Sequence, residues 1–200
     1  MKYIRKVRRY FNRPEKPVFS YSELKTLGIP EKYAKVLIYN MIKRKEIYRV
    51  RKGWYTFHSD PLVFIFTLPP NTAYYGLGFA AHLYKAWDQV PNPEILTYVA
   101  PRKIRSGTYF FLNTPIIVRR ISKKMFFGYK LLMYNRWYIP VSSPEKTLID
   151  MVYYDYPFLD EILPSLIEII NFNDLRKMLP DNSSLERKVK ICLKKYNLIL

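Results

Sequence analysis

Apolar residues at helical spacing open the chain and predict an amphipathic helix over Tyr3–Phe11. A second, shorter helix is predicted to start at Ser20. Ser20 and Glu23 have the spacing of a capping box, in which each residue satisfies a backbone N–H of the other. We expect this helix to run to Leu27, and we expect Gly28 to form the turn that follows it.

A longer helix is predicted from about Pro30 to Lys45, with Pro30 at its first position. Its apolar positions form one stripe: Ala34, Leu37, Ile38, Met41 and Ile42. Two short strands, Ile47–Val50 and Trp54–Phe57, then flank a basic turn. Two helices joined by a glycine turn and followed by a hairpin are typical of a winged helix-turn-helix.

The remaining residues alternate between strand and helix patterns. Strands are predicted over 62–68, 94–100, 108–112, 116–121, 129–134 and 137–141, and a helix is predicted over 75–87. After Pro144 the pattern is helical, with breaks near Pro157, Pro164 and 180–182. The fold class is therefore α+β. Residues 1–58 form a winged helix-turn-helix domain, and residues 59–200 form a mixed α/β domain with a helical carboxy-terminal part.

The charge distribution indicates which class of partner the protein binds. The chain holds 34 Lys and Arg against 16 Asp and Glu, a net charge of +18. Residues 1–57 carry 16 basic and 4 acidic residues, and residues 95–144 carry 9 basic residues and no acidic one, whereas 145–186 are mainly acidic. Such a field attracts polyanions, of which nucleic acid is the first candidate and an anionic membrane surface the second. A generally Lys-rich surface is the alternative explanation.

The candidate DNA-binding residues lie on the predicted third helix and in the hairpin. In this motif the second helix of the pair enters the major groove. Opposite its apolar stripe, and in the hairpin, are the residues expected to contact DNA: Lys32, Lys35, Tyr39, Asn40, Lys43, Arg44, Arg49, Arg51 and Lys52. Lysine bonds guanine acceptors or phosphates, asparagine pairs with adenine, and tyrosine bonds phosphate. The alternative is that these are ordinary solvated charges.

Further phosphate contacts are expected outside this helix. The candidates are Arg5, Arg8, Arg9, Arg102, Lys103, Arg105, Arg119 and Arg120. The first helix could instead lie on a membrane, but its apolar face is narrow for stable anchoring. We therefore expect no membrane partner.

Convergent catalytic groups are absent from the sequence pattern. Two histidines, His58 and His82, and one cysteine give no metal-ligand spacing, and no glycine-rich phosphate loop is found. We expect no enzyme, cofactor or metal. Two alternatives stay open. A nuclease would hold Mg²⁺ with the acidic residues Asp150, Asp155, Asp160 and Glu161, and an RNA-binding protein would stack aromatic side chains on bases.

Cys192 and the apolar runs bear on the compartment. A lone cysteine forms no internal disulfide, which fits a reducing compartment, and its lysine neighbours could lower its pKa. No signal peptide is apparent. The longest apolar run, Leu62–Leu68, is far below the roughly 20 residues that span a bilayer. A cytoplasmic protein is expected.

Four segments resemble a known family, the AbiEi antitoxins. They are 53–55 (Gly-Trp-Tyr), 74–84, 93–102 and 141–150, of which Ser-Pro-Glu-Lys-Thr-Leu-Ile-Asp at 143–150 is the most specific. Physically, Ser142 or Ser143 would cap a helix that starts with Pro144. The alternative for this segment is a direct partner contact.

The resemblance implies a repressor of its own operon that acts as an antitoxin. The partners would be a double-stranded DNA operator and a nucleotidyltransferase toxin, which family members counter without a stable complex. Because one winged helix reads a half-site, we expect two copies on an inverted repeat.

Overall fold

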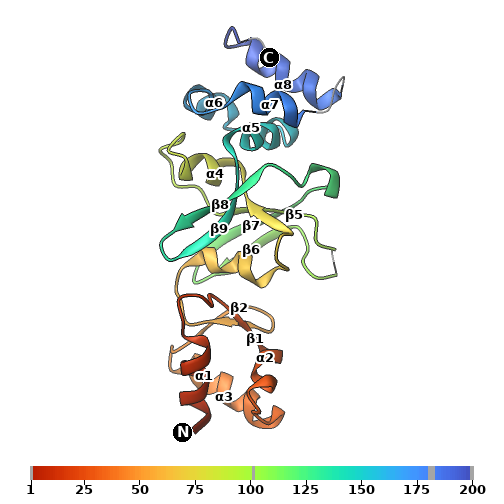
Figure 1. The fold of residues 1–200 in the computed structure, drawn as a ribbon. Helices are drawn as coiled ribbons and strands as arrows, with labels where there is room; N and C mark the ends of the chain where they lie inside the picture. Colours follow the sequence, from red (N-terminus) through yellow and green to blue (C-terminus); the bar gives the residue numbers. More distant parts are fainter. Residues whose placement is uncertain (1, 101, 180–182, 199–200) are drawn as a thin grey trace.

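Three layers follow one another along the long direction of the molecule (Figure 1). The computed structural model describes residues 2–100, 102–179 and 183–198. The amino-terminal unit, defined as residues 2–58, lies at one end. A six-stranded sheet occupies the middle, and a layer of carboxy-terminal helices lies at the other end.

The amino-terminal unit consists of helices and short strands, and a short turn joins its second and third helices. Its elements are α1 (Lys2–Phe11), β1 (Phe19–Ser20), α2 (Tyr21–Thr26), α3 (Glu31–Lys43), β2 (Tyr48–Arg51) and β3 (Trp54–Thr56). The strands pair antiparallel in the order β1-β3-β2. Phe11 of α1 stacks on Phe19 of β1 at 4.6 Å between ring centroids, inside a core that the three helices share. The predicted helices are present; β1, with two residues, was too short to predict.

The rest of the chain forms the second unit, residues 59–198. Its elements are η1 (Pro61–Thr67), β4 (Ala73–Tyr75), α4 (Leu77–Leu83), β5 (Glu94–Thr97), β6 (Gly107–Phe111), β7 (Thr114–Arg120), η2 (Lys123–Met125), β8 (Tyr129–Tyr134), β9 (Trp137–Ser142), α5 (Pro144–Tyr153), α6 (Leu159–Ile167), α7 (Phe172–Met178) and α8 (Ser184–Lys194). The sheet order is β6-β7-β5-β4-β9-β8. The β5–β7 and β4–β9 pairs are parallel and the other pairs antiparallel. The α+β class is confirmed.

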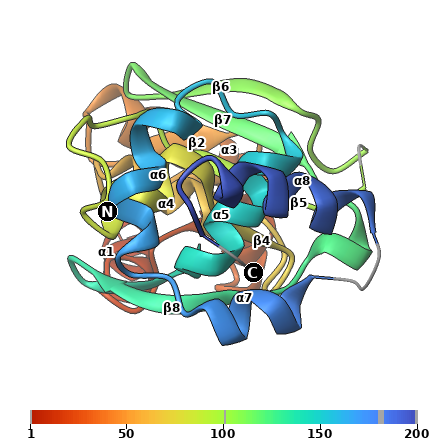
Figure 2. The same ribbon diagram turned by 90° about the horizontal axis from the view of Figure 1, so that it is seen from above.

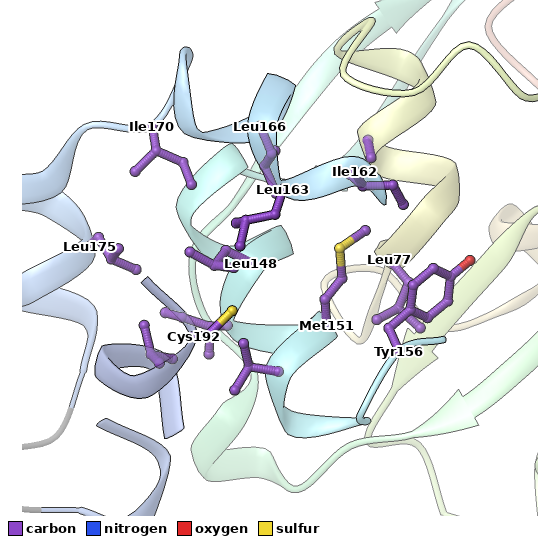
Figure 3. Packing of buried hydrophobic residues seen from close by; sticks show 14 of the residues in the cluster. Leu77, Leu148, Met151, Tyr156, Ile162, Leu163, Leu166, Ile170, Leu175 and Cys192 are labelled. Atoms are coloured by element: carbon purple, nitrogen blue, oxygen red, sulfur yellow. The ribbon is translucent and has the colours of Figure 1, made fainter. Parts of the chain in front are cut away.

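Helix α5 is the centre of the helical layer (Figure 2). Ser143 caps it by accepting the Lys146 N–H, and Pro144 takes its first position, so the helix start read from the sequence is confirmed. Leu148 of α5 lies together with Leu163 of α6 and Cys192 of α8 in one apolar cluster (Figure 3). This cluster attaches the carboxy-terminal helices to the sheet.

The prediction of a strand over Leu62–Leu68 was wrong. The segment is the 3₁₀ helix η1, started by Asp60, whose side chain accepts the Leu62 N–H at 2.8 Å. Pro61 follows with the fixed φ that suits a first helical position. Because η1 is buried on nearly all sides, its residues are apolar throughout, and no periodicity distinguishes helix from strand.

The predicted helix over Tyr75–Trp87 was too long at both ends. Tyr75 belongs to β4, which is buried on both faces between β5 and β9, and α4 ends at Leu83. A strand and a helix that are both fully buried give one continuous apolar run. The boundary therefore could not be read from the hydrophobic pattern.

Pro164 does not break the helix as predicted but lies inside α6. Proline lacks the N–H that would bond the carbonyl four residues earlier, here that of Asp160. The Tyr196 hydroxyl donates to the Asp160 carbonyl at 3.2 Å instead. A tertiary contact thus satisfies the freed acceptor. The break predicted at Pro157 is present between α5 and α6, and 180–182 lie outside the described residues.

The two units share a continuous hydrophobic contact. Val18 and Val50 of the amino-terminal unit belong to the same buried cluster as η1 and the sheet. The Trp137 indole N–H donates to the Pro14 carbonyl at 2.6 Å. The small β1-β3-β2 sheet is therefore covered by α1–α3 on one face and by the second unit on the other.

Candidate nucleic-acid interface

A fixed turn orients α3 relative to α2. Ser20 and Glu23 form the predicted capping box: the Ser20 N–H donates to Glu23 Oε2 at 2.6 Å, and the Glu23 N–H donates to Ser20 Oγ at 3.3 Å. Gly28 follows with φ +70°, a left-handed conformation that glycine adopts without strain. Pro30 then precedes the first residue of α3 rather than occupying it. The capping box and the Gly28 turn together determine which face of α3 packs on the core.

The buried face of α3 defines the exposed one. Ala34, Leu37, Ile38 and Met41 are buried as predicted, whereas Ile42, which was predicted in the same stripe, is exposed. Lys32, Lys35, Tyr39, Lys43 and Arg44 are exposed on the opposite side, and Asn40 is partly buried. Among the described residues no acidic side chain forms a salt bridge with the three lysines or with Arg44. The face is therefore an uncompensated cationic surface.

Val36 is a residue of this face that the sequence reasoning missed. Its side chain is 54% exposed, and Tyr39 is 66% exposed. Lys32, Val36, Tyr39 and Lys43 follow at steps of four, three and four residues, so they form one row. The spacing places Val36 on this face, but valine has no group that bonds a phosphate or a base edge, which is what the predicted contacts have in common.

The hairpin contributes less than predicted. Arg49 and Lys52 are exposed, and the turn consists of Lys52 and Gly53 alone. Arg51 has partners inside the protein: its Nε donates to Thr67 Oγ1 at 2.7 Å and its Nη2 donates to the Thr67 carbonyl at 2.6 Å. Burial lowers the pKa of this guanidinium. Arg51 joins the hairpin to η1 and is not a free contact for a ligand.

Arginines of α1 add charge beside α3. Arg5, Arg8 and Arg9 are exposed, and Arg8 forms a salt bridge with Glu46 at 2.9 Å. The α1 and α3 helices meet where the Tyr3 and Tyr33 rings lie 5.0 Å apart. Both helices therefore contribute to one end of the molecule (Figure 1).

The candidates of the second unit divide into two groups. Arg102, Lys103 and Arg105 are exposed in the segment between β5 and β6, and Lys103 lines a surface hollow together with Trp54 of the hairpin.

Arg119 and Arg120, in contrast, have partners inside the second unit. Arg119 forms a salt bridge with buried Glu94 at 3.0 Å, and the Arg120 guanidinium donates to the Val99 carbonyl. Arg119 thereby links β7 to β5, and Arg120 links β7 to the segment that follows β5.

The acidic residues considered for Mg²⁺ are engaged elsewhere. Asp155 and Asp160 pair with Lys188 and Lys195 of the α8 end, at 3.4 and 3.7 Å. Glu161 accepts the Trp87 indole N–H at 2.8 Å. In the described ranges no three His, Cys, Asp or Glu side chains are grouped so as to hold a metal ion. These carboxylates connect helices.

Asp150 forms a buried polar cluster that the sequence reasoning did not identify. Lys146, one turn earlier on α5, forms a salt bridge with Asp150, and both side chains are fully buried. The Tyr74 hydroxyl donates to the other Asp150 oxygen at 2.9 Å. Burial lowers the pKa of Lys146 and raises the pKa of Asp150, and the ion pair opposes both shifts. The most family-specific segment thus has a structural role.

His58, His82 and Cys192 lie in separate places. His58 packs edge-on against Trp137 at 4.9 Å, and burial and nearby Arg136 lower its pKa. His82 Nδ1 lies 3.2 Å from the Trp87 carbonyl. Burial raises the pKa of the Cys192 thiol, contrary to the effect expected from its lysine neighbours.

The fold and this surface define a class: an α+β protein of two packed units with a cationic helix exposed at one end. A family model described as "Transcriptional regulator, AbiEi antitoxin" matches residues 10–58, which confirms the resemblance for the amino-terminal unit. By that description the family consists of transcriptional regulators, and the matched residues make up about a quarter of the chain. The three segments at 74–84, 93–102 and 141–150 all lie outside the matched residues.

Other comparisons bear on the fold. The crystal structure of the RV2827C protein from Mycobacterium tuberculosis is similar with a TM-score of 0.65 and 15% identity, over 97% of this chain and 77% of that one. At this identity the likeness shows the fold alone. No curated protein matches the chain. Within the part of the chain that is described, no helix is both long and apolar enough to cross a bilayer.

Proposed function

We propose that the chain is a sequence-specific DNA-binding repressor whose amino-terminal unit is a winged helix-turn-helix. The observation that carries this proposal is the uncompensated cationic face of α3, opposite its buried stripe. In this motif such a helix enters the major groove. Lys32, Lys35 and Lys43 then reach guanine acceptors or phosphates, and Tyr39 reaches phosphate.

Neighbouring cations extend this footprint along the phosphate backbone. Arg44, Arg49, Lys52 and the exposed arginines of α1 are sequence-independent contacts, which strengthen binding and make it salt-dependent. Asn40 is only partly exposed, so its pairing with adenine requires a side-chain rotation. In the second unit, Arg102, Lys103 and Arg105 form a further contact.

The family match supports the antitoxin part of the proposal. The protein represses its own operon, bound as two copies to an inverted repeat, and counters a nucleotidyltransferase toxin without forming a stable complex with it. Co-expression with a nucleotidyltransferase encoded beside its gene tests this part: growth is expected to be rescued. Continued growth arrest at equal antitoxin levels would contradict the antitoxin role.

Titration of a fluorescent duplex from just upstream of its own gene tests the DNA-binding part. Affinity is measured against a scrambled duplex at several salt concentrations. Tight binding that survives scrambled competitor is expected. Equal, steeply salt-dependent binding to both duplexes would contradict sequence specificity and leave only attraction to polyanions.

Two lysine variants locate the contact on the protein. Lys35→Ala is expected to weaken binding and to reduce the slope of log affinity against log salt by about 1, because one phosphate or base contact is lost. Lys194→Ala makes the same charge change on exposed α8, in the layer beyond the sheet, and should leave the slope unchanged. An equal effect of both variants would show that net charge, and not α3, determines binding.

The segment between β5 and β6 has its own test. Because the two units share a buried cluster, truncating the second unit would disturb the fold of the first. Replacing Arg102, Lys103 and Arg105 together with alanine keeps the cluster intact. A reduced salt slope is expected, and an unchanged affinity and slope would remove this segment from the footprint.

A further inference from the structure

Val36 is an anomaly in the cationic face of α3. Its side chain is 54% exposed in the middle of the helix, although valine gains nothing from exposure and is a poorer helix former than alanine or leucine. It is not part of the buried stripe. Lys32 precedes it by four residues, and Lys43 follows it by seven. An apolar group therefore lies beside Tyr39 in the middle of a row whose two ends are positively charged.

The composition of this row restricts what can bind to it. The lysines at its two ends favour a polyanion, and no acidic residue lies in the row to attract a basic partner. Duplex DNA meets both requirements. Its phosphates border the major groove, and its floor carries one apolar group, the C5 methyl of thymine.

We infer that Val36 reads the methyl group of a thymine in the operator, with the Tyr39 ring beside it on the same row. This inference rests on the proposed function and adds a specificity-determining contact to it. The lysines and Tyr39 hold α3 against the phosphates and the groove edges. Val36 cannot form a hydrogen bond with a base, so it favours thymine over cytosine by contact with the methyl group and by exclusion of water.

Deoxyuridine isolates this contact, because it keeps every hydrogen-bonding group of thymine and lacks only the methyl. Each thymine of the operator duplex is replaced in turn by deoxyuridine, and binding is measured by fluorescence anisotropy. The wild-type protein is expected to lose about fourfold in affinity at one thymine of each half-site, the effect of one buried methyl group. The other thymines are expected to have no comparable effect.

The variant Val36→Ala completes a double-mutant cycle. It should bind the thymine operator more weakly than wild type and should not distinguish thymine from deoxyuridine at that position. Val90→Ala is the matched control, since Val90 is 80% exposed between α4 and β5, and it should keep the discrimination. Val36→Ala should not lower the melting temperature, because alanine is the better helix former, and Val90→Ala should leave it unchanged because Val90 lies exposed outside a helix.

Every result that differs from these expectations contradicts a specific part of the proposal. If no deoxyuridine substitution weakens specific binding, methyl reading is wrong while the repressor proposal stands. If Val36→Ala keeps the full discrimination, another residue contacts the methyl and the assignment to Val36 is wrong. If operator and scrambled duplex bind equally, the proposed function and this inference both fail.

Discussion

Replacing Lys146 with methionine tests how far one buried ion pair supports the helical layer. Lys146 and Asp150 lie one turn apart on α5 and are both fully buried. The Lys146 ammonium also lies 4.7 Å from the centroid of the Phe127 ring, and Asp150 accepts the Tyr74 hydroxyl. Methionine replaces the aliphatic stem of lysine with an unbranched apolar chain of similar size and removes the charge. Asp150 is then left with a single hydrogen-bond donor and no opposite charge.

The expected loss is large relative to the stability of a domain. Removing one partner of a buried pair costs about 3–5 kcal/mol, because the remaining charge is uncompensated, whereas a typical protein unfolds with about 5–15 kcal/mol. Urea unfolding followed by tryptophan fluorescence at pH 7 measures this free energy. The double variant Lys146→Met, Asp150→Asn removes both charges and should cost less than Lys146→Met alone.

Acidification gives an independent signature of the same pair. Without Lys146, burial raises the pKa of Asp150 further, so the native state of the variant binds a proton that the unfolded state does not. Stability of the variant therefore rises relative to wild type as the pH falls from 7 to 5. A loss below about 1 kcal/mol, a double variant no better than the single one, or a constant gap between pH 7 and 5 would refute the reasoning.

Three further predictions concern local contacts. Ser20→Ala removes a helix cap and should lower the free energy of unfolding by about 0.5–2 kcal/mol; no change would show that water replaces the cap. Gly78→Ala brings a methyl against the Tyr156 hydroxyl and to 2.8 Å from Trp87, which should cost about 1–3 kcal/mol in thermal unfolding. In a Tyr156→Phe background, which lacks the hydroxyl and its hydrogen bond to Glu94, the same Gly78→Ala change should cost less, and an equal cost in both backgrounds would contradict the clash. Because the pKa of His58 is lowered in the native state, the unfolded state binds more protons below about pH 6.5, so stability should fall on acidification. His58→Phe should reduce this dependence, and equal slopes in both proteins would count against it.

Local signals predicted much of the fold. The capping box at Ser20 and the cap at Ser143 involve partners within three residues, so the sequence displays them directly. Strand β8 was predicted with its observed bounds because turns delimit it. By contrast, η1 and β4 are buried on nearly all sides, and their uniform apolar residues contain no period to read. The continuation of α6 through Pro164 depends on a hydroxyl 32 residues away in the chain.

In the candidate site too, features set by local spacing were predicted, and contacts between distant residues were not. Periodicity placed Lys35 on the exposed face of α3, because a helix that buries one stripe must expose the other. The internal partners of Arg51 and Arg119, which are Thr67 and Glu94, were not predicted because they are 16 and 25 residues distant in the sequence. An arginine on its own does not reveal whether it faces solvent or holds two elements together. Val36 was missed because its chemistry differs from that of its neighbours.

The contact between the two units has a genetic consequence. The Trp137 indole bonds the Pro14 carbonyl, and Arg51 is held by Thr67, so the orientation of the amino-terminal unit depends on residues far from α3. Under the proposed repressor function, alleles that relieve repression should therefore map across the whole gene, including the codons of β9 and η1. A collection of such alleles confined to codons 2–58 would mean that the two units fold and act separately.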